Sequence, residues 1–182
     1  MIAIGNKNFI SFLDGANQID EHVLKTETNQ NIAIILALLR IWNRNFLNLP
    51  MHGIMPYDHR LARLPAWAQQ LEMESNGKSV DIRGDALTQP ASPLIWGEAG
   101  TNAQHSFFQY LHQGIEQQSL DILIPRNSLG CSLPDGWQES HQTLVYNALA
   151  QAEALAIGEN NQKEPHRNFP GGRVSTLISW NK

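Results

Sequence analysis

A glycine-rich turn that leads into a helix start has residue types and spacing suited to chemistry. It reads Gly97-Glu98-Ala99-Gly100-Thr101-Asn102-Ala103-Gln104-His105. Two of its glycines let the backbone approach a ligand, the helix start presents free N–H groups, and His105 follows one turn later. From spacing alone, the pattern slightly favours a structural interpretation, in which Glu98 and Thr101 are first-turn and capping residues and His105 is a surface histidine.

A second polar cluster runs from Gln69 to Lys78 and surrounds a helix end predicted at Asn76-Gly77. Glu74 falls in the last turn, where the helix dipole disfavours a carboxylate, so a functional role for it deserves a test. Taken alone, the pattern favours a solvated helix end in which Glu74 pairs with Lys78 four residues later.

Several other site types are not expected. The histidine pairs His52/His59 and His105/His112 are each seven residues apart, which is too far for two neighbouring zinc ligands on one helix face, and there is no cysteine pair. A Walker P-loop, a Gly-x-Gly-x-x-Gly turn and a Gly-x-Ser-x-Gly motif are all absent from the sequence. We therefore predict no metal site and no cofactor.

The elements that must position these residues alternate between helices and short apolar strands. Four strands are predicted, at 53–56, 94–96, 120–125 and 174–180. Four helices are predicted, over 31–46, 58–76, 101–113 and 137–157. Asp58 is the predicted cap of the second helix, and Gly114 and Gly158 are the predicted stops of the third and fourth. Proposed caps are Thr28 or Asn29 for the first of these helices and Thr101 or Asn102 for the third. The first predicted strand has a length typical of an edge strand in a parallel sheet. This alternation predicts an α/β fold with a mainly parallel sheet.

Composition limits the classes of protein further. The 182 residues are 42% hydrophobic and 16% charged, which predicts one globular domain. A net charge of −4 without a basic cluster argues against nucleic acid, and the single Cys131 cannot form an internal disulfide. The apolar stretch 32–39 is about half the length of a spanning helix, so we predict a buried helix and no membrane segment. No secretory signal is visible, and the expected location is cytoplasmic.

The two clusters, taken with the motifs around them, resemble the phosphoglucose isomerase family. The matching segments, in chain order, are Asp14-Gly15-Ala16, Asp20-Glu21-His22, Pro56-Tyr57-Asp58, Met73-Glu74-Ser75-Asn76-Gly77-Lys78, 96–107, Leu111-His112-Gln113-Gly114, 150–155 and, more weakly, Phe169-Pro170-Gly171-Gly172-Arg173. An ordered set of this length is much more specific than any one motif.

The resemblance implies an aldose–ketose isomerase that interconverts glucose 6-phosphate and fructose 6-phosphate. It implies that Glu74 is the base that moves a proton between C1 and C2 through a cis-enediol. His105 would assist ring opening across the interface of a homodimer, and Gln70 would contact the substrate. It also implies that residues 1–182 form one incomplete domain, the second sugar-isomerase (SIS) domain of the family, with a doubly wound, flavodoxin-like sheet.

Departures from the family pattern limit this expectation. Ala99, Ala103 and Val174 replace a Pro, a Gly and a Pro of the family motifs. The family's phosphate-gripping Ser/Thr-Lys loop, its Gly-Gly-Arg segment and its catalytic Lys would lie outside these 182 residues. We therefore expect the chain alone to be nearly inactive. The alternatives are a non-catalytic sugar-phosphate-binding SIS module and a purely structural α/β remnant.

Overall fold

The computed structural model describes residues 1–127 and 136–181 and divides into two compact units, Met1–Leu47 and Asn48–Lys182. Cys131, named in the sequence analysis above, lies outside the described residues.

The first unit consists of α1 (Gly5–Lys25), α2 (Ile32–Ile41) and a π-helical turn, η1 (Trp42–Phe46). The predicted helix over 31–46 is confirmed, but its cap is Asn31 rather than Thr28 or Asn29. The Asn31 side-chain oxygen accepts from the Ile34 N–H at 3.4 Å, and its amide donates to the Val23 carbonyl at 2.9 Å. Asn31 therefore joins the end of α1 to the start of α2.

The prediction that the apolar stretch 32–39 forms a buried helix is wrong for this structure. None of the residues of α2 is buried, and Leu38 is 58% exposed. A helix can bury an apolar stripe only against another element, and a unit of two helices offers too little surface to cover it.

The second unit is built on a four-stranded sheet. Its strands are β1 (Met51–Pro56), β2 (Leu94–Trp96), β3 (Ser119–Pro125) and β4 (Ser175–Trp180). All pairs are parallel, and the spatial order is β2-β1-β3-β4. The four predicted strands and the α/β class are thus confirmed, and the order agrees with the first four strands of a flavodoxin-like sheet. The first strand is not an edge, because β1 lies between β2 and β3.

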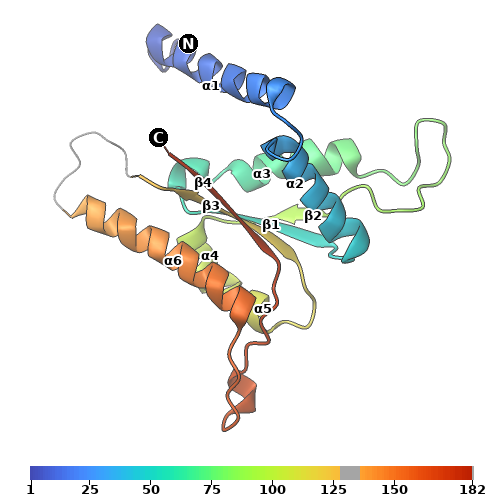
Figure 1. Ribbon diagram of the computed structural model, residues 1–182, viewed down its shortest axis with the longest axis vertical. Coiled ribbons are helices and arrows are strands. Elements are labelled where there is room, and N and C mark those ends of the chain that lie inside the picture. The colour runs from blue at the N-terminus through green and yellow to red at the C-terminus, as the bar shows by residue number, and fades with distance from the viewer. Residues whose placement is uncertain (128–135, 182) are drawn as a thin grey trace. The chain divides into compact units, whose positions relative to one another are not determined.

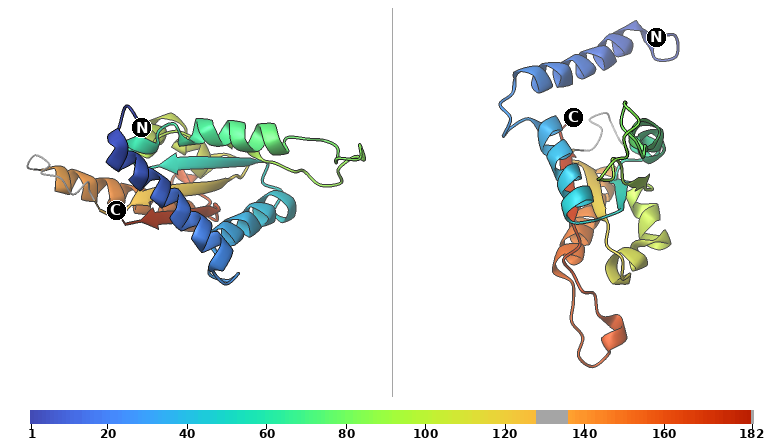
Figure 2. Two further views of the ribbon diagram at one scale, coloured as in Figure 1. Left: turned by 90° about the horizontal axis from the view of Figure 1, so that it is seen from above. Right: turned by 90° about the vertical axis from the view of Figure 1, so that its right-hand side faces the viewer.

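Helices cover the sheet on both faces. The helix α3 (Leu64–Ala68) continues as the π-helical segment η3 (Gln69–Glu74), and both connect β1 to β2. The helices α4 (Gly100–Ser106), α5 (Phe108–Gln113) and α6 (Trp137–Ile157) come later in the chain. Figures 1 and 2 show α3 on one side of the strands and α4, α5 and α6 on the other. The sheet is therefore doubly wound, as expected.

The helix boundaries test the predicted start and stop residues. The prediction for α6 holds at both ends, and Gly158 closes it with φ +71°. The segment that Asp58 caps is a short 3₁₀ turn, η2 (His59–Leu61), and the α3–η3 helix runs on to residue 76 before Gly77. The predicted helix over 101–113 is two helices with a break at Phe107, and neither Thr101 nor Asn102 caps it.

That helix begins earlier than predicted because of a close approach to Tyr57. A Cβ added at Gly100, the first residue of α4, would lie 2.3 Å from Cε2 of the Tyr57 ring. Only glycine permits this contact, and packing rather than a side-chain cap sets the start of the helix.

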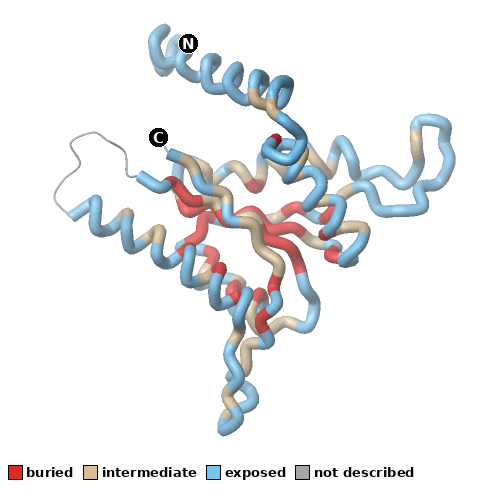
Figure 3. The backbone as a smooth tube through the Cα atoms, in the orientation of Figure 1, coloured by how far each residue is buried: buried red, intermediate tan, exposed pale blue. Residues whose placement is uncertain are grey.

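The apolar core lies on the face covered by α4, α5 and α6. Figure 3 shows buried residues along the central strands. It contains Met55, Tyr57, Ala103, Phe108, Leu111, Leu120, Ile122, Ile124, Ala148, Ala152 and Leu155. The listed residues of β3, Leu120, Ile122 and Ile124, alternate along the strand, as the pleat requires. The apolar run of β3 therefore contributes only every second residue to this core, and β1 contributes Met55.

Three polar residues of β1 and β3 form a buried network on the other face, namely His52, Ser119 and Asp121. His52 is 2% exposed and lies between two side chains of β3. Its Nδ1 is 2.8 Å from the Ser119 Oγ, and its Nε2 is 2.9 Å from the Asp121 Oδ2. The network links the two central strands through side chains as well as through their backbone ladder.

Removal of the imidazole is expected to be costly. His52→Ala should lower the free energy of unfolding by about 3 kcal/mol, because Ser119 and Asp121 both lose their His52 partner in a buried site. Ser119→Ala removes one neutral hydrogen bond and should cost about 1 kcal/mol. Urea unfolding of the two variants measures both values, and equal losses would contradict a central role for His52.

Candidate active site

The first candidate residues, Gln70 and Glu74, lie four residues apart on η3, and both side chains are exposed. Residues at this spacing are neighbours on a helix surface. The helix ends where the Gly77 N–H donates to the Met73 carbonyl at 2.9 Å. Glu74 is therefore in the last turn, as predicted, and an amide and a carboxylate face solvent side by side.

Lys78 supports the helix end. Its Nζ donates to the backbone carbonyl of Glu74 at 2.5 Å. That carbonyl belongs to the last turn of the helix, whose C=O groups have no partner within it. The lysine therefore caps the backbone, which differs from the carboxylate pairing with Glu74 that spacing alone favoured.

A small hairpin follows Lys78. Val80 and Ala86 form an isolated antiparallel bridge. The Asp81 carboxylate accepts the backbone N–H groups of Arg83 at 2.8 Å and of Asp85 at 3.0 Å. These hydrogen bonds, that of Arg83 first, hold the pKa of Asp81 below its usual range, because they favour the charged carboxylate.

The second candidate segment leaves β2 through a tight turn. Gly97 has φ +152°, and a Cβ added there would lie 2.0 Å from the Ile54 carbonyl oxygen. The Glu98 side chain accepts from the N–H of Ala99 at 3.0 Å, so it contacts the turn itself. Glu98 therefore contacts the turn before α4 and is not a residue of the first helical turn, as its spacing had suggested.

Tyr57 holds α4 against the end of β1. Its hydroxyl accepts a hydrogen bond from the Gln104 Nε2 at 2.8 Å, and its ring packs on Gly100. Burial raises the pKa of Tyr57 above its ordinary value, and the hydrogen bond from Gln104 opposes part of this shift. Tyr57 was not among the predicted site residues, although the strand end Pro56-Tyr57-Asp58 was a visible signal.

His105 follows Gln104 and is exposed in the last turn of α4. Because α3 and η3 cover one face of the sheet and α4 the other, Glu74 and His105 lie on opposite faces of one chain. A single copy brings Gln70 and Glu74 together and does not bring His105 to them.

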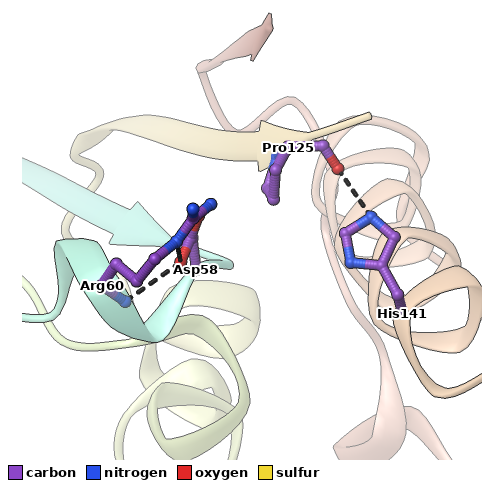
Figure 4. A network of polar contacts seen from close by, with 4 residues as sticks. All are labelled: Asp58, Arg60, Pro125 and His141. Carbon is purple, nitrogen blue, oxygen red and sulfur yellow. Dashed lines mark hydrogen bonds and ion pairs between the residues drawn. The ribbon is translucent and has the colours of Figure 1, made fainter. Parts of the chain in front are cut away.

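Polar contacts also lie at the carboxyl ends of β1 and β3, where the strand order reverses. Figure 4 shows the Asp58 carboxylate with Arg60, and the His141 ring with the Pro125 carbonyl oxygen. The Arg60 Nε donates to the Asp58 Oδ1 at 2.9 Å, and the His141 Nε2 lies 3.0 Å from the Pro125 oxygen. The hydrogen bond to Asp58 raises the pKa of Arg60. In parallel α/β sheets this reversal point is where ligands commonly bind.

The described residues hold neither a metal-ligand cluster nor a helix that could span a membrane. Residues 1–127 and 136–181 contain no group of three His, Cys, Asp or Glu side chains that would hold a metal ion. Within the same ranges, the helices are too short or too polar to cross a membrane.

Comparison with known proteins gives consistent matches. The sequence pattern of the family described as phosphoglucose isomerase matches residues 1–182. A glucose-6-phosphate isomerase of Chelativorans sp. is 42% identical over 100% of this chain, and one of Xanthomonas campestris pv. campestris is 47% identical over 97%. These alignments cover 36% and 34% of the two relatives, so the chain spans about a third of their length.

A solved structure agrees with these sequence matches. The crystal structure of a glucose-6-phosphate isomerase from Chlamydia trachomatis superposes with a TM-score of 0.85 at 38% identity. The superposition covers 96% of this chain and 34% of that one. The fold described above is therefore that of one third of such an enzyme.

The buried phenol of Tyr57 predicts a pH dependence. The pKa of Tyr57 is raised in the folded state above the unfolded value of about 10, so the neutral phenol stabilises the fold fully below that pH. This contribution is lost as the pH rises through the folded-state pKa. We expect the unfolding free energy to fall above about pH 10, and part of that fall to disappear in Tyr57→Phe.

Urea unfolding between pH 8 and 11 measures this effect. Tyr146, on α6, is exposed and gives the matched control, because Tyr146→Phe should leave the alkaline fall as it is. If the unfolding free energy of Tyr57→Phe showed the same pH dependence as that of the unsubstituted chain, the raised pKa of Tyr57 could not be the cause of the alkaline fall.

Proposed function

Since this chain belongs to the phosphoglucose isomerase family, we propose that it is part of an enzyme that interconverts glucose 6-phosphate and fructose 6-phosphate. The observation that carries the proposal is the match of the family pattern along residues 1–182, together with the exposed pair Gln70 and Glu74 on one helix. The substrate is therefore a sugar phosphate. We further propose a cytoplasmic location, which is the location expected for a relative of the glucose-6-phosphate isomerases that it matches.

Glu74 is the proposed base. Its carboxylate takes the proton from C2 of the open-chain aldose, which leads to a cis-enediol intermediate, and returns the proton at C1. The O2 hydroxyl proton passes to O1 as the C2 carbonyl of the ketose forms. An amide at Gln70, one helical turn away, is suited to hydrogen-bond a sugar hydroxyl or the enediol oxygen. Side-by-side placement of a proton acceptor and a neutral donor favours this assignment.

His105 is the proposed residue for ring opening, contributed by a second copy of the chain. The support is geometric, since the sheet separates η3 from α4 within one copy. A histidine exposed on α4 is available to a neighbouring subunit. We propose a homodimer in which His105 of one subunit completes the site that contains Glu74 of the other.

The domain assignment is also a proposal. We assign residues 1–182 to the second SIS domain of the family, and the β2-β1-β3-β4 order supports a flavodoxin-like sheet. The matched part covers about a third of the relatives, so we expect the 182 residues alone to turn over substrate poorly.

The second candidate function is a sugar-phosphate-binding module without catalysis. It is favoured by the separation of Glu74 from His105 within one copy. Calorimetry with fructose 6-phosphate separates the possibilities, because a binding module shows heat of binding without any turnover, and a structural remnant shows neither.

A chimera tests the enzyme proposal. In it, this chain replaces the matching third of the Chlamydia trachomatis enzyme, to which it superposes over 96% of its length. A coupled assay should detect isomerase activity in the chimera, and Glu74→Gln should lower kcat by about 100- to 10,000-fold, because the amide accepts no proton from carbon.

Glu139→Gln is the matched control, since Glu139 is an exposed carboxylate in the first turn of α6. It should leave kcat unchanged. Full activity in the Glu74→Gln chimera would contradict the assignment of the base, and an inactive chimera that still binds fructose 6-phosphate would favour the binding module.

A further inference from the structure

The edge strand β2 contains one residue whose backbone groups both face away from the sheet. Of the described strands, only β1 pairs with β2. The Leu94 N–H donates to the Pro50 carbonyl at 2.9 Å, so Leu94 faces β1 and the next residue, Ile95, faces outward. Ile95 is 1% exposed, and unpaired backbone groups at a buried residue are costly.

Two side chains of η3 occupy these positions in place of another strand. The Gln69 Nε2 donates to the Ile95 carbonyl oxygen at 3.1 Å, and the Ile95 N–H donates to the Met73 sulfur at 3.3 Å. The amide is a good donor and the thioether a weak acceptor, so each group of Ile95 meets a partner of the required kind. η3 thus closes the edge of the sheet.

Gln69 and Met73, here called the two anchors, have the same spacing as the two candidate site residues. Gln69 and Met73 are four residues apart, and Gln70 and Glu74 follow them by one residue each. We propose that Gln69 and Met73 are positioning residues, which fasten η3 to Ile95 and so fix the direction in which Gln70 and Glu74 project. This inference rests on the proposed function, in which Gln70 and Glu74 contact the substrate.

The anchors lie in a segment with unusual helix geometry. η3 is π-helical, whereas the segments before and after it are α-helical. A π segment is uncommon and occurs often at functional sites, and it rotates the following residues relative to the preceding helix. The two hydrogen bonds hold this π-helical segment against one strand residue. Errors of about 1 Å in the placement of a base can cost about 100-fold in rate.

Three variants of the 182-residue chain separate hydrogen bonding from packing. Gln69→Met keeps the length of the side chain and removes the donor, whereas Gln69→Lys keeps a donor. Met73→Leu keeps an apolar side chain of similar size and removes the sulfur. Gln138→Met, at an exposed glutamine of α6, is the control for loss of a surface amide.

NMR relaxation and hydrogen exchange give the readouts. In Gln69→Met and Met73→Leu, the backbone order parameters at Gln70 and Glu74 should fall from about 0.85 to below about 0.6, while those of α6 stay unchanged. The Ile95 amide should exchange about 10-fold faster or more. Gln69→Lys should restore the order parameters. Unchanged order in Gln69→Met and Met73→Leu, or no restoration by Gln69→Lys, would overturn the proposal.

Turnover in the chimera provides a second readout. Gln69→Met should lower kcat about 10- to 100-fold, and the double variant with Glu74→Gln should be no slower than Glu74→Gln alone, because Gln69 acts through Glu74. Additive losses would contradict the positioning role. An inactive chimera, or one insensitive to Glu74→Gln, counts against the proposed function, and the relaxation data then decide the anchoring by themselves.

Discussion

Right-handed crossovers between parallel strands are the constraint on which the placement of the candidate residues depends. The chain moves from β1 to β2 in one direction across the sheet and then crosses back over β1 to reach β3. Because each crossover keeps the same hand, the reversal moves the connecting helices from one face to the other. η3 and α4 are consequently separated by the sheet, and so are Glu74 and His105. This separation supports the proposed homodimer, in which a second copy of the chain supplies the other residue of the site.

Each of the two candidate helices is tied to the sheet by a small number of contacts. η3 is held to the edge strand by Gln69 and Met73, and α4 is held to the end of β1 by Tyr57. The two faces of the central strands β1 and β3 differ. One face packs into the apolar core, and the other contains the buried His52 network. The rigid sheet thus positions exposed polar side chains on both of its faces.

The sequence predicted most of this fold because its signals are local. The strands, the extent of α6 and its stop at Gly158 follow from apolar runs and glycine. The start of α4 packs against Tyr57 and η3 bonds to Ile95. Both partners are distant in the sequence, so no local pattern reveals these contacts. The burial of α2 was predicted wrongly, because an apolar stripe indicates a need for a partner and not its presence.

The central claim, that Glu74 and His105 act together only across two subunits, is tested most directly by subunit complementation. Chimeric subunits with Glu74→Gln are mixed with chimeric subunits with His105→Ala, and the mixture is assayed after dissociation and reassociation. If the site is shared between subunits, mixed dimers contain one intact site, and random pairing should restore about a quarter of the unsubstituted activity. If both residues act within one chain, no site in the mixture is intact, and the activity should stay at the level of the separate variants.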